Sequence, residues 1–289
     1  MKVSIITPVY NQAKFIQETI ESVLKQDYPE IEYIVLDDGS KDETPVVVGE
    51  YADRLIHVRH DNIGESRTVN KGYRMCTGDI VGVVNSDDPL FTLDAVSKVV
   101  ECFRSRPNAS AVYPDWASID ENGALIEEFR LPQYTIEGML TEFNVSLGPG
   151  MFIRRDLLAA MGYRNESVRY TGDLDLSFRL ALAGELAHLP SIIATHRVHP
   201  AAASSAATGE TMARELVDMA QRTLDSPLLS KQLRGRKAGI LAFVNQVASN
   251  YCGADEAAKA QFIRKAKVLG RWAKVLRAKD KAMEIFTGR

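Results

Sequence analysis

The chain has 289 residues, of which 45% are hydrophobic, enough for one large globular domain or two unequal ones. Its formal net charge of −3 argues against a dedicated nucleic-acid-binding protein. The charge is uneven, because residues 230–289 hold 14 Lys or Arg against 4 Asp or Glu. This basic tail indicates an acidic partner or membrane surface, or else an ordinary solvated helix face.

The three cysteines, Cys76, Cys102 and Cys252, are far apart and form no CxxC pair. They are typical of small buried side chains in a reducing compartment. An apolar strand is expected from Val3, so we expect no secretory signal before it. No apolar run approaches the ~20 residues that span a bilayer. The expected location is the cytoplasm, with a peripheral position at the inner face of the membrane as a variant.

The first 115 residues alternate short apolar segments with segments of helical periodicity. A helix is expected to follow the first strand, with Asn11 as its N-cap. The expected strands cover residues 3–7, 33–36, 55–58 and 80–84, and further helices cover about 66–76 and 93–105. Strand–helix alternation with short connections predicts a mostly parallel sheet that helices cover on both faces.

The pattern is less regular after residue 110. Strands are expected at 111–113 and 192–194, helices at 156–161 and 173–183, and a loop-rich stretch at 120–150. The small polar run 201–209 is expected to be mobile, and residues 210–289 are expected to be helical. An apolar stripe along the last helix is expected to pack in a core or against a partner. The stripe comprises Phe262, Ala266, Leu269, Trp272 and Leu276.

The strand at 80–84 runs directly into Asn85-Ser86-Asp87-Asp88. A strand buried on both faces cannot hold charge, so the two acids must emerge at its carboxyl end, where open α/β sheets bind ligands. Two oxygen ligands on a rigid strand end suit Mg²⁺ or Mn²⁺ with a phosphorylated substrate. The alternative is a plain polar turn closed by Pro89.

Two other strands end in polar turns that belong at the same edge of the sheet. Residues 7–11 close the first strand, where a rigid proline turn can present the Tyr10 ring to a flat base. Asp37 and Asp38 close the second, where a carboxylate can accept a hydrogen bond from a base. Ordinary turn chemistry also explains each turn alone. The segment 64–72 is no phosphate loop, but its helix can bring Arg67 or Asn70 beside a nucleotide, with a surface role as the alternative.

The ordered set of motifs resembles a bacterial family 2 glycosyltransferase with the GT-A fold. Any single motif is weak, whereas the order over about residues 1–205 is specific, and the NSDD form is similar to one branch of the family. The motifs are SIITPVYN at 4–11, LDDGS at 36–40, GESRTVNKG at 64–72, VVNSDD at 83–88, Tyr113-Pro114-Asp115, GMFIRR at 150–155, TGDLDLSFRLA at 171–181 and Arg197-Val198-His199-Pro200.

This resemblance implies an α/β GT-A fold with a mostly parallel central sheet, helices on both faces and a C-terminal helical extension. It implies a catalytic domain over residues 1–205, with a nucleotide-binding half at 1–115 and an acceptor-binding half at 116–205. The helical extension would cover residues 206–289.

The resemblance also implies roles for single residues. Asp173 is the expected general base, which takes the proton of the acceptor hydroxyl. The expected ligands of Mn²⁺ or Mg²⁺ are Asp87, Asp88 and His199, and Arg197 with His199 is expected to close over the diphosphate. Asn85 and Gly172 replace acids that are common in the family. The expected nucleotide-binding residues are Thr7, Pro8, Val9, Tyr10, Asp38, Gly64, Arg67, Asn70, Ser86 and Asp87.

The implied function is that of a metal-dependent, inverting, hexosyltransferase-like enzyme. It would move a sugar from a nucleoside diphosphate sugar, expected to be a UDP-sugar, to a glycan or lipid-linked acceptor in surface polysaccharide or glycoconjugate synthesis. A sugar nucleotidyltransferase is an alternative, although the Gly- and Arg-rich loop it needs after the first strand is absent. A non-catalytic sugar-nucleotide-binding module is another. The C-terminal helices would contact a membrane, form a homodimer or pack on the catalytic domain.

Overall fold

The structure is a computed structural model that describes residues 1–143, 145, 147–199 and 209–287, with side chains up to residue 274 in the last helix. The chain divides into two compact units. The first comprises Met1–Tyr134, Ser146–Glu166 and Ala183–Ala202, and the second comprises Thr135–Val145, Ser167–Leu182 and Ala203–Arg289. Two segments before residue 205 therefore belong with the C-terminal helices. The predicted division into a catalytic domain and an extension stays a prediction about function.

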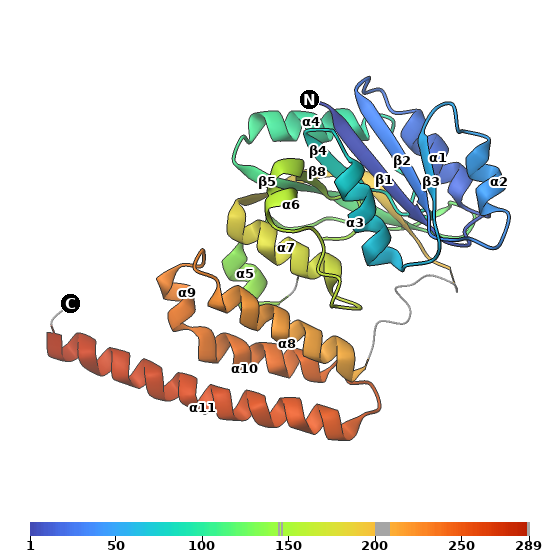
Figure 1. Ribbon diagram of the computed structural model, residues 1–289. Coiled ribbons are helices and arrows are strands. Elements are labelled where there is room, and N and C mark those ends of the chain that lie inside the picture. Colours follow the sequence, from blue (N-terminus) through green and yellow to red (C-terminus); the bar gives the residue numbers. More distant parts are fainter. Residues whose placement is uncertain (144, 146, 200–208, 288–289) are drawn as a thin grey trace. The chain divides into compact units, whose positions relative to one another are not determined.

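The first unit contains an eight-stranded sheet in the described part of the chain, with the order β3-β2-β1-β4-β7-β5-β6 and with β8 paired to β5. Figure 1 labels β1 to β5 and β8 of this sheet. The first four strands are parallel, β7 is antiparallel to β4 and β5, and β8 is parallel to β5. The strands are β1 (Val3–Val9), β2 (Ile31–Asp37), β3 (Ile56–Arg59), β4 (Ile80–Val83), β5 (Ala109–Ile119), β6 (Leu125–Phe129), β7 (Phe152–Arg154) and β8 (Glu185–Arg197).

Helices cover both faces of this sheet, because alternate residues of a strand point to opposite sides. Val3 and Ile5 of β1 share a core with α1 and α4. On the other face, a Cβ on Gly72 of α3 would lie 2.8 Å from Ile6 Cγ2, so the glycine lets α3 approach the sheet closely. The helices of the unit are α1 (Ile16–Leu24), α2 (Thr44–Gly49), α3 (Glu65–Met75), α4 (Ala95–Ser105) and α6 (Arg155–Ala160).

Each strand and helix expected in the first 115 residues is present, but the prediction that Asn11 caps the first helix is wrong. Asn11 has a φ of 52°, and its Oδ1 accepts a hydrogen bond from Lys41 N at 2.8 Å. Phe15 occupies the N-cap position of α1. The Asn11 amide therefore joins two loops. The stretch expected to be loop-rich also contains β6 and α5 (Ile136–Thr141).

The second unit is helical. It contains α5, α7 (Gly172–Ala183), α8 (Glu210–Asp225), α9 (Lys231–Gly235), α10 (Lys237–Ser249) and α11 (Glu256–Thr287). Helices α8, α10 and α11 lie side by side in Figure 1. Their small core is formed by Ala213, Val217, Ala248, Cys252, Ala258 and Phe262. No helix in the described ranges has both the length and the apolar character required to cross a bilayer.

Of the predicted stripe on the last helix, Phe262 and Ala266 are buried, whereas Trp272 is 61% exposed, so that packing of Trp272 against a partner stays a prediction. The buried face continues instead through Ala273. The side chain of Leu276 and the segment 201–208 that was expected to be mobile lie outside the described residues.

Candidate active site

The turn after β4 brings Asp87 and His199 together. Asp87 Oδ2 lies 2.9 Å from His199 Nε2, and the His199 ring packs against Phe15 with 4.8 Å between centroids. Burial and the neighbouring charge of Asp88 raise the pKa of Asp87, while the hydrogen bond with His199 acts in the opposite direction. A carboxylate and an imidazole from positions 112 residues apart thus meet at the carboxyl end of β4.

Asp88 is turned into the protein. Its Oδ1 accepts a hydrogen bond from Arg197 N at 2.7 Å, and its Oδ2 accepts one from Asn85 Nδ2 at 3.0 Å. Its nearness raises the pKa of His196, whose Nδ1 lies 3.6 Å from Asp88 Oδ1. Both oxygens therefore have protein partners, and the predicted metal role of Asp88 stays a prediction. Asn85 is suited to its place because an amide donates where a carboxylate would repel Asp88.

Arg197 is 1% exposed and binds groups within its own unit. Its Nε donates to Asp87 O at 2.9 Å, its Nη1 to Asp120 O at 3.0 Å, and its Nη2 to Glu18 Oε2 at 2.6 Å. The guanidinium also lies 5.0 Å from the centre of the Phe15 ring. In this arrangement Arg197 holds the turn that carries Asp87, and its expected contact with a diphosphate stays a prediction.

The end of β2 and the start of α3 form a second cluster. Asp38 Oδ1 accepts a hydrogen bond from Ile63 N at 2.7 Å, and Oδ2 accepts one from Gly64 N at 2.9 Å. Gly64 has a φ of 88°, a conformation that glycine adopts without strain. Asp38 therefore ties the loop before α3 to the sheet, and its expected contact with a base would use its remaining lone pairs.

The turn after β1 combines buried and exposed side chains. Thr7 Oγ1 lies 3.0 Å from the Tyr33 hydroxyl in the core, and Val9 is also buried. Tyr10, which follows Pro8 and Val9, is 43% exposed, so its ring is the accessible group of the predicted base-binding turn. Ser86 is buried, and its carbonyl oxygen accepts a hydrogen bond from Thr19 Oγ1 at 3.0 Å.

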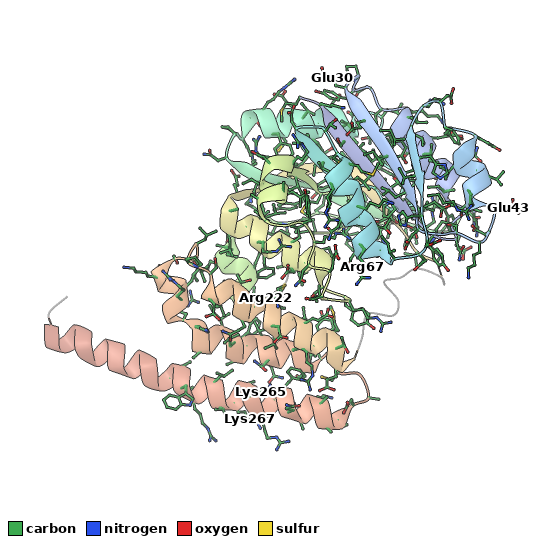
Figure 2. All side chains as sticks on the ribbon, viewed as in Figure 1. Glu30, Glu43, Arg67, Arg222, Lys265 and Lys267 are labelled. Atoms are coloured by element: carbon green, nitrogen blue, oxygen red, sulfur yellow. The ribbon has the colours of Figure 1, made fainter. Side chains whose placement is uncertain are left out.

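Two residues of α3 are expected to contact the nucleotide, and one of them, Asn70, forms side-chain hydrogen bonds within the protein. Its Nδ2 donates to Arg164 O at 2.9 Å and to Glu166 Oε1 at 2.8 Å, and its Oδ1 accepts from Arg164 N at 2.9 Å. Arg67 is exposed, with its Nε 3.7 Å from Glu166 Oε2, and it is labelled in Figure 2. Of the two residues, Arg67 is therefore the one whose side chain is accessible to a ligand, whereas the Asn70 side chain holds the segment around residue 165.

Asp173 lies in the second unit, on the first turn of α7. Its side chain is exposed, and its Oδ1 is 2.7 Å from Leu174 N. Because α7 begins at Gly172, Asp173 is a first-turn residue and not an N-cap. Asp175, in contrast, is buried and accepts hydrogen bonds from Arg179 Nε and Arg222 Nη2, each at 2.8 Å.

The structure joins Asp87, Asp88, Arg197 and His199 in one hydrogen-bonded cluster. Sequence reasoning missed three residues whose side chains contact this cluster: Phe15, Glu18 and His196. Phe15 and Glu18 follow the first motif at positions that look like an ordinary amphipathic helix, so no local pattern marks them. His196 directly precedes Arg197, so its place beside the last motif is a sequence signal that could have indicated it.

The comparisons with known proteins decide the family. The model of the glycosyl transferase family 2 matches residues 4–160. The chain belongs to glycosyl transferase family 2. An uncharacterized glycosyltransferase of Rickettsia typhi is 28% identical over 219 residues, which cover 72% of this chain and 67% of that protein. Chondroitin synthase of Escherichia coli is 32% identical over 201 residues, which cover 68% of this chain and only 29% of the synthase.

Solved structures show the fold. The chain resembles residues 1–349 of TarS from S. aureus, crystallised with UDP-GlcNAc, with a TM-score of 0.73 and 20% identity over 100% of this chain and 93% of that one. It resembles the mannosyltransferase PcManGT of Pyrobaculum calidifontis, in complex with GDP-Man and Mn²⁺, with a TM-score of 0.60 and 19% identity over 98% and 80% of the two chains. The predicted GT-A fold with C-terminal helices is confirmed. The family excludes the sugar nucleotidyltransferase alternative.

Proposed function

We propose that this family 2 glycosyltransferase is an inverting enzyme that transfers a sugar from a UDP-sugar to an acceptor hydroxyl in the synthesis of a surface polysaccharide or glycoconjugate. The observation that carries the proposal is the pair of Asp87 and His199, 2.9 Å apart at the carboxyl end of β4, in a chain of this family. The UDP-GlcNAc complex of TarS and the name of the chondroitin synthase support a UDP-sugar and a polysaccharide.

The same pair fits a divalent cation. A carboxylate and an imidazole are donors that Mn²⁺ accepts, and the side chain of Asp87 is 18% exposed. Burial and the Asp88 charge raise the pKa of Asp87, so a cation beside it would offset an unfavourable concentration of negative charge. Among the described residues, no cluster of three or more His, Cys, Asp or Glu side chains is arranged to hold a metal. A bound Mn²⁺ or Mg²⁺ would neutralise charge on the departing diphosphate.

The exposure and position of Asp173 support its proposed role as the general base. Its carboxylate is exposed on the first turn of α7, whereas the neighbouring Asp175 is buried between two arginines. In the proposed step, the acceptor oxygen bonds to the anomeric carbon as its proton passes to Asp173. The bond from that carbon to the diphosphate oxygen breaks, and the nucleoside diphosphate leaves with the electron pair. The anomeric configuration is inverted because there is one displacement.

The surface of α11 supports contact with an anionic membrane at the inner face, as the basic tail indicates. Val268 and Trp272 are exposed one helical turn apart, and exposed cations surround them. Figure 2 labels two of these cations, Lys265 and Lys267. The others in the described part of the helix are Arg264, Arg271 and Lys274. A homodimer through the predicted stripe has less support, because Phe262 and Ala266 are buried within their own unit.

Calorimetry with UDP and with UDP-GlcNAc, each with and without Mn²⁺, tests the proposal directly. We expect Mn²⁺ to strengthen binding to the native protein, and Asp87→Asn to weaken Mn²⁺-supported binding by about tenfold or more, as the loss of a charged ligand predicts. Asp53→Asn is the matched control, because Asp53 is an exposed carboxylate of the same unit. Wild-type affinity in Asp87→Asn with Mn²⁺ present would contradict the assignment of the metal ligand.

The release of UDP from UDP-GlcNAc, with water as the acceptor, tests the base. We expect Asp173→Asn to reduce this activity to a small residual rate and to keep the affinity of the native protein for UDP with Mn²⁺, because the base acts on the acceptor and not on the nucleotide. Native activity in Asp173→Asn would refute the base. A native protein that neither binds UDP nor releases it would refute the donor.

A further inference from the structure

Helix α8 holds the segment that leads into α7. Glu215 Oε1 accepts a hydrogen bond from Arg169 N at 2.7 Å, and Glu215 Oε2 accepts from Tyr170 N at 2.9 Å and Thr171 N at 3.1 Å. The Thr171 hydroxyl donates the fourth hydrogen bond to this carboxylate, to Oε2 at 3.2 Å. A single carboxylate thus collects three consecutive backbone amides immediately before the helix that carries Asp173. Hydrogen bonds to an ionised acceptor are about twice as strong as those between neutral groups.

The same helix also holds the residues on the other side of Asp173. Arg222, labelled in Figure 2, lies two turns after Glu215 and donates from Nη2 to Asp175 Oδ1 at 2.8 Å. Residues seven positions apart share a helix face. Asp175 is 4% exposed, and its backbone N–H donates to Thr171 O at 2.7 Å. Glu215 therefore binds the chain two residues before Asp173, at Thr171, and Arg222 binds it two residues after Asp173, at Asp175.

We propose that Glu215, together with Arg222, is a positioning residue for Asp173, so that the C-terminal helices form part of the catalytic apparatus. The inference rests on the proposed role of Asp173 as the base. The segment before α7 has no regular secondary structure between Tyr163 and Thr171. The Glu215 carboxylate therefore orients the three backbone N–H groups of residues 169–171 through its hydrogen bonds. A displacement of about 1 Å at a catalytic group can lower a rate by about a hundredfold, which is why a remote anchor affects turnover.

The test compares UDP release from UDP-GlcNAc with UDP binding, both with Mn²⁺, in four proteins. These are the native chain, Glu215→Gln, Arg222→Met and Asp218→Asn. Asp218 is an exposed carboxylate on the same helix and is the matched control. We expect Glu215→Gln to lower kcat for UDP release at least tenfold and to leave the dissociation constant for UDP within twofold. Arg222→Met should lower kcat by a smaller factor, and Asp218→Asn should match the native chain.

A double variant separates positioning from stability alone. In an Asp173→Asn background, Glu215→Gln should cause no further loss of residual UDP release, because a residue that acts through another loses its effect when the other is gone. A purely structural role would lower the melting temperature and leave native kcat in the folded fraction, or would add its loss to that of Asp173→Asn. Either result overturns the inference. If Glu215→Gln does not fold, the same comparison with Arg222→Met decides.

Failure of the inference is distinct from failure of the proposed function. Loss of UDP release in Asp173→Asn together with native kcat in Glu215→Gln and Arg222→Met overturns the positioning role and leaves the base in place. Native release in Asp173→Asn overturns the base itself, and the positioning role falls with it.

Discussion

Single residues around β4 show how partners restrict chemistry. Asp87 and Asp88 are adjacent and chemically identical, yet Asp87 meets a histidine and keeps part of its surface, whereas Asp88 is occupied by Arg197 N and Asn85. The difference arises because successive residues of a turn point in different directions, and because β8 passes Asp88 directly. Asp87 is therefore the more accessible of the two predicted ligands, and Asp88 has partners within the protein.

The change Asn85→Asp is expected to destabilise the metal-free protein by about 1–3 kcal/mol, because an amide donor is replaced by a carboxylate 3.0 Å from Asp88. The loss should be smaller at pH 4 than at pH 7, since two close carboxylates share a proton more readily in acid. Urea denaturation at both values of pH measures it. Asn85→Ser, which can still donate, is the control, and an equal loss in the two variants would exclude repulsion as the cause.

Glu32 on β2 should contribute stability that depends on pH. Partial burial alone would raise its pKa, but hydrogen bonds from Lys2, Ser4 and Thr77 outweigh burial and lower the pKa from 4.5 to about 2. A pKa that is lower in the folded state stabilises the fold above the unfolded value. This contribution should be complete above about pH 4.5 and should disappear as the pH falls toward 2.

Glu32→Gln is therefore expected to lower the free energy of unfolding by about 2 kcal/mol at pH 7, the size of a charged hydrogen-bond network. The difference from the native protein should shrink as the pH falls below 4.5. Glu30→Gln is the control, because Glu30 is 60% exposed and pairs only with the chain's amino terminus in the described contacts. A difference that stays constant from pH 7 to pH 3.5 would contradict this account.

Between elements, close packing of β4 against β7 requires a glycine. Gly82 is the register partner of Phe152, and a Cβ at this position would lie 2.4 Å from the Phe152 ring. Gly82→Ala should therefore destabilise the protein by about 1–3 kcal/mol through overpacking. The double variant with Phe152→Leu should lose less than the sum of the single changes, because the two residues are in contact.

Gly49 in α2 provides the matched control for this prediction. A Cβ added there would meet no atom within 4 Å, so Gly49→Ala should leave the protein unchanged or stabilise it by about 0.4–1 kcal/mol. Thermal and urea denaturation measure both variants. Equal effects of the two substitutions would show that contact with Phe152 is not what Gly82 avoids.

At the scale of the whole molecule, the residues proposed for catalysis are distributed over two compact units. Asp38, Asp87 and His199 belong to the unit with the sheet, and Asp173 belongs to the unit that contains the C-terminal helices. Chain order hides this division, since residue 173 precedes β8 and the helical tail. Removal of the residues after 205 would therefore remove Glu215, the partner of the segment before α7, and Arg222, the partner of Asp175 in α7.

The basic face of α11 predicts how the full chain meets lipid. The full chain should float with vesicles of phosphatidylglycerol and phosphatidylcholine but not with vesicles of phosphatidylcholine alone. Added salt should reduce flotation, because each cation near an anionic surface contributes about 1 kcal/mol and salt screens this attraction. Replacing both Val268 and Trp272 by Ala should reduce it severalfold. Phe91→Ala is the control, because Phe91 is an exposed aromatic residue of the other unit. Equal flotation with both lipids would contradict the charge argument.

The sequence by itself determined the alternation of strands and helices, the family resemblance and the edge at which Asp87 emerges. These follow from local order: apolar runs form buried strands, and charge must appear where such strands end. Only the tertiary structure decided which polar side chains are engaged internally. Asp88 meets Arg197 across 109 positions, and Asn70 meets Arg164 across 94. The partners of a polar group come from distant segments that only the folded chain brings together. Asp38, Asn70 and Arg197 therefore have hydrogen bonds within the protein that the sequence did not indicate, and their expected contacts with the nucleotide stay predictions.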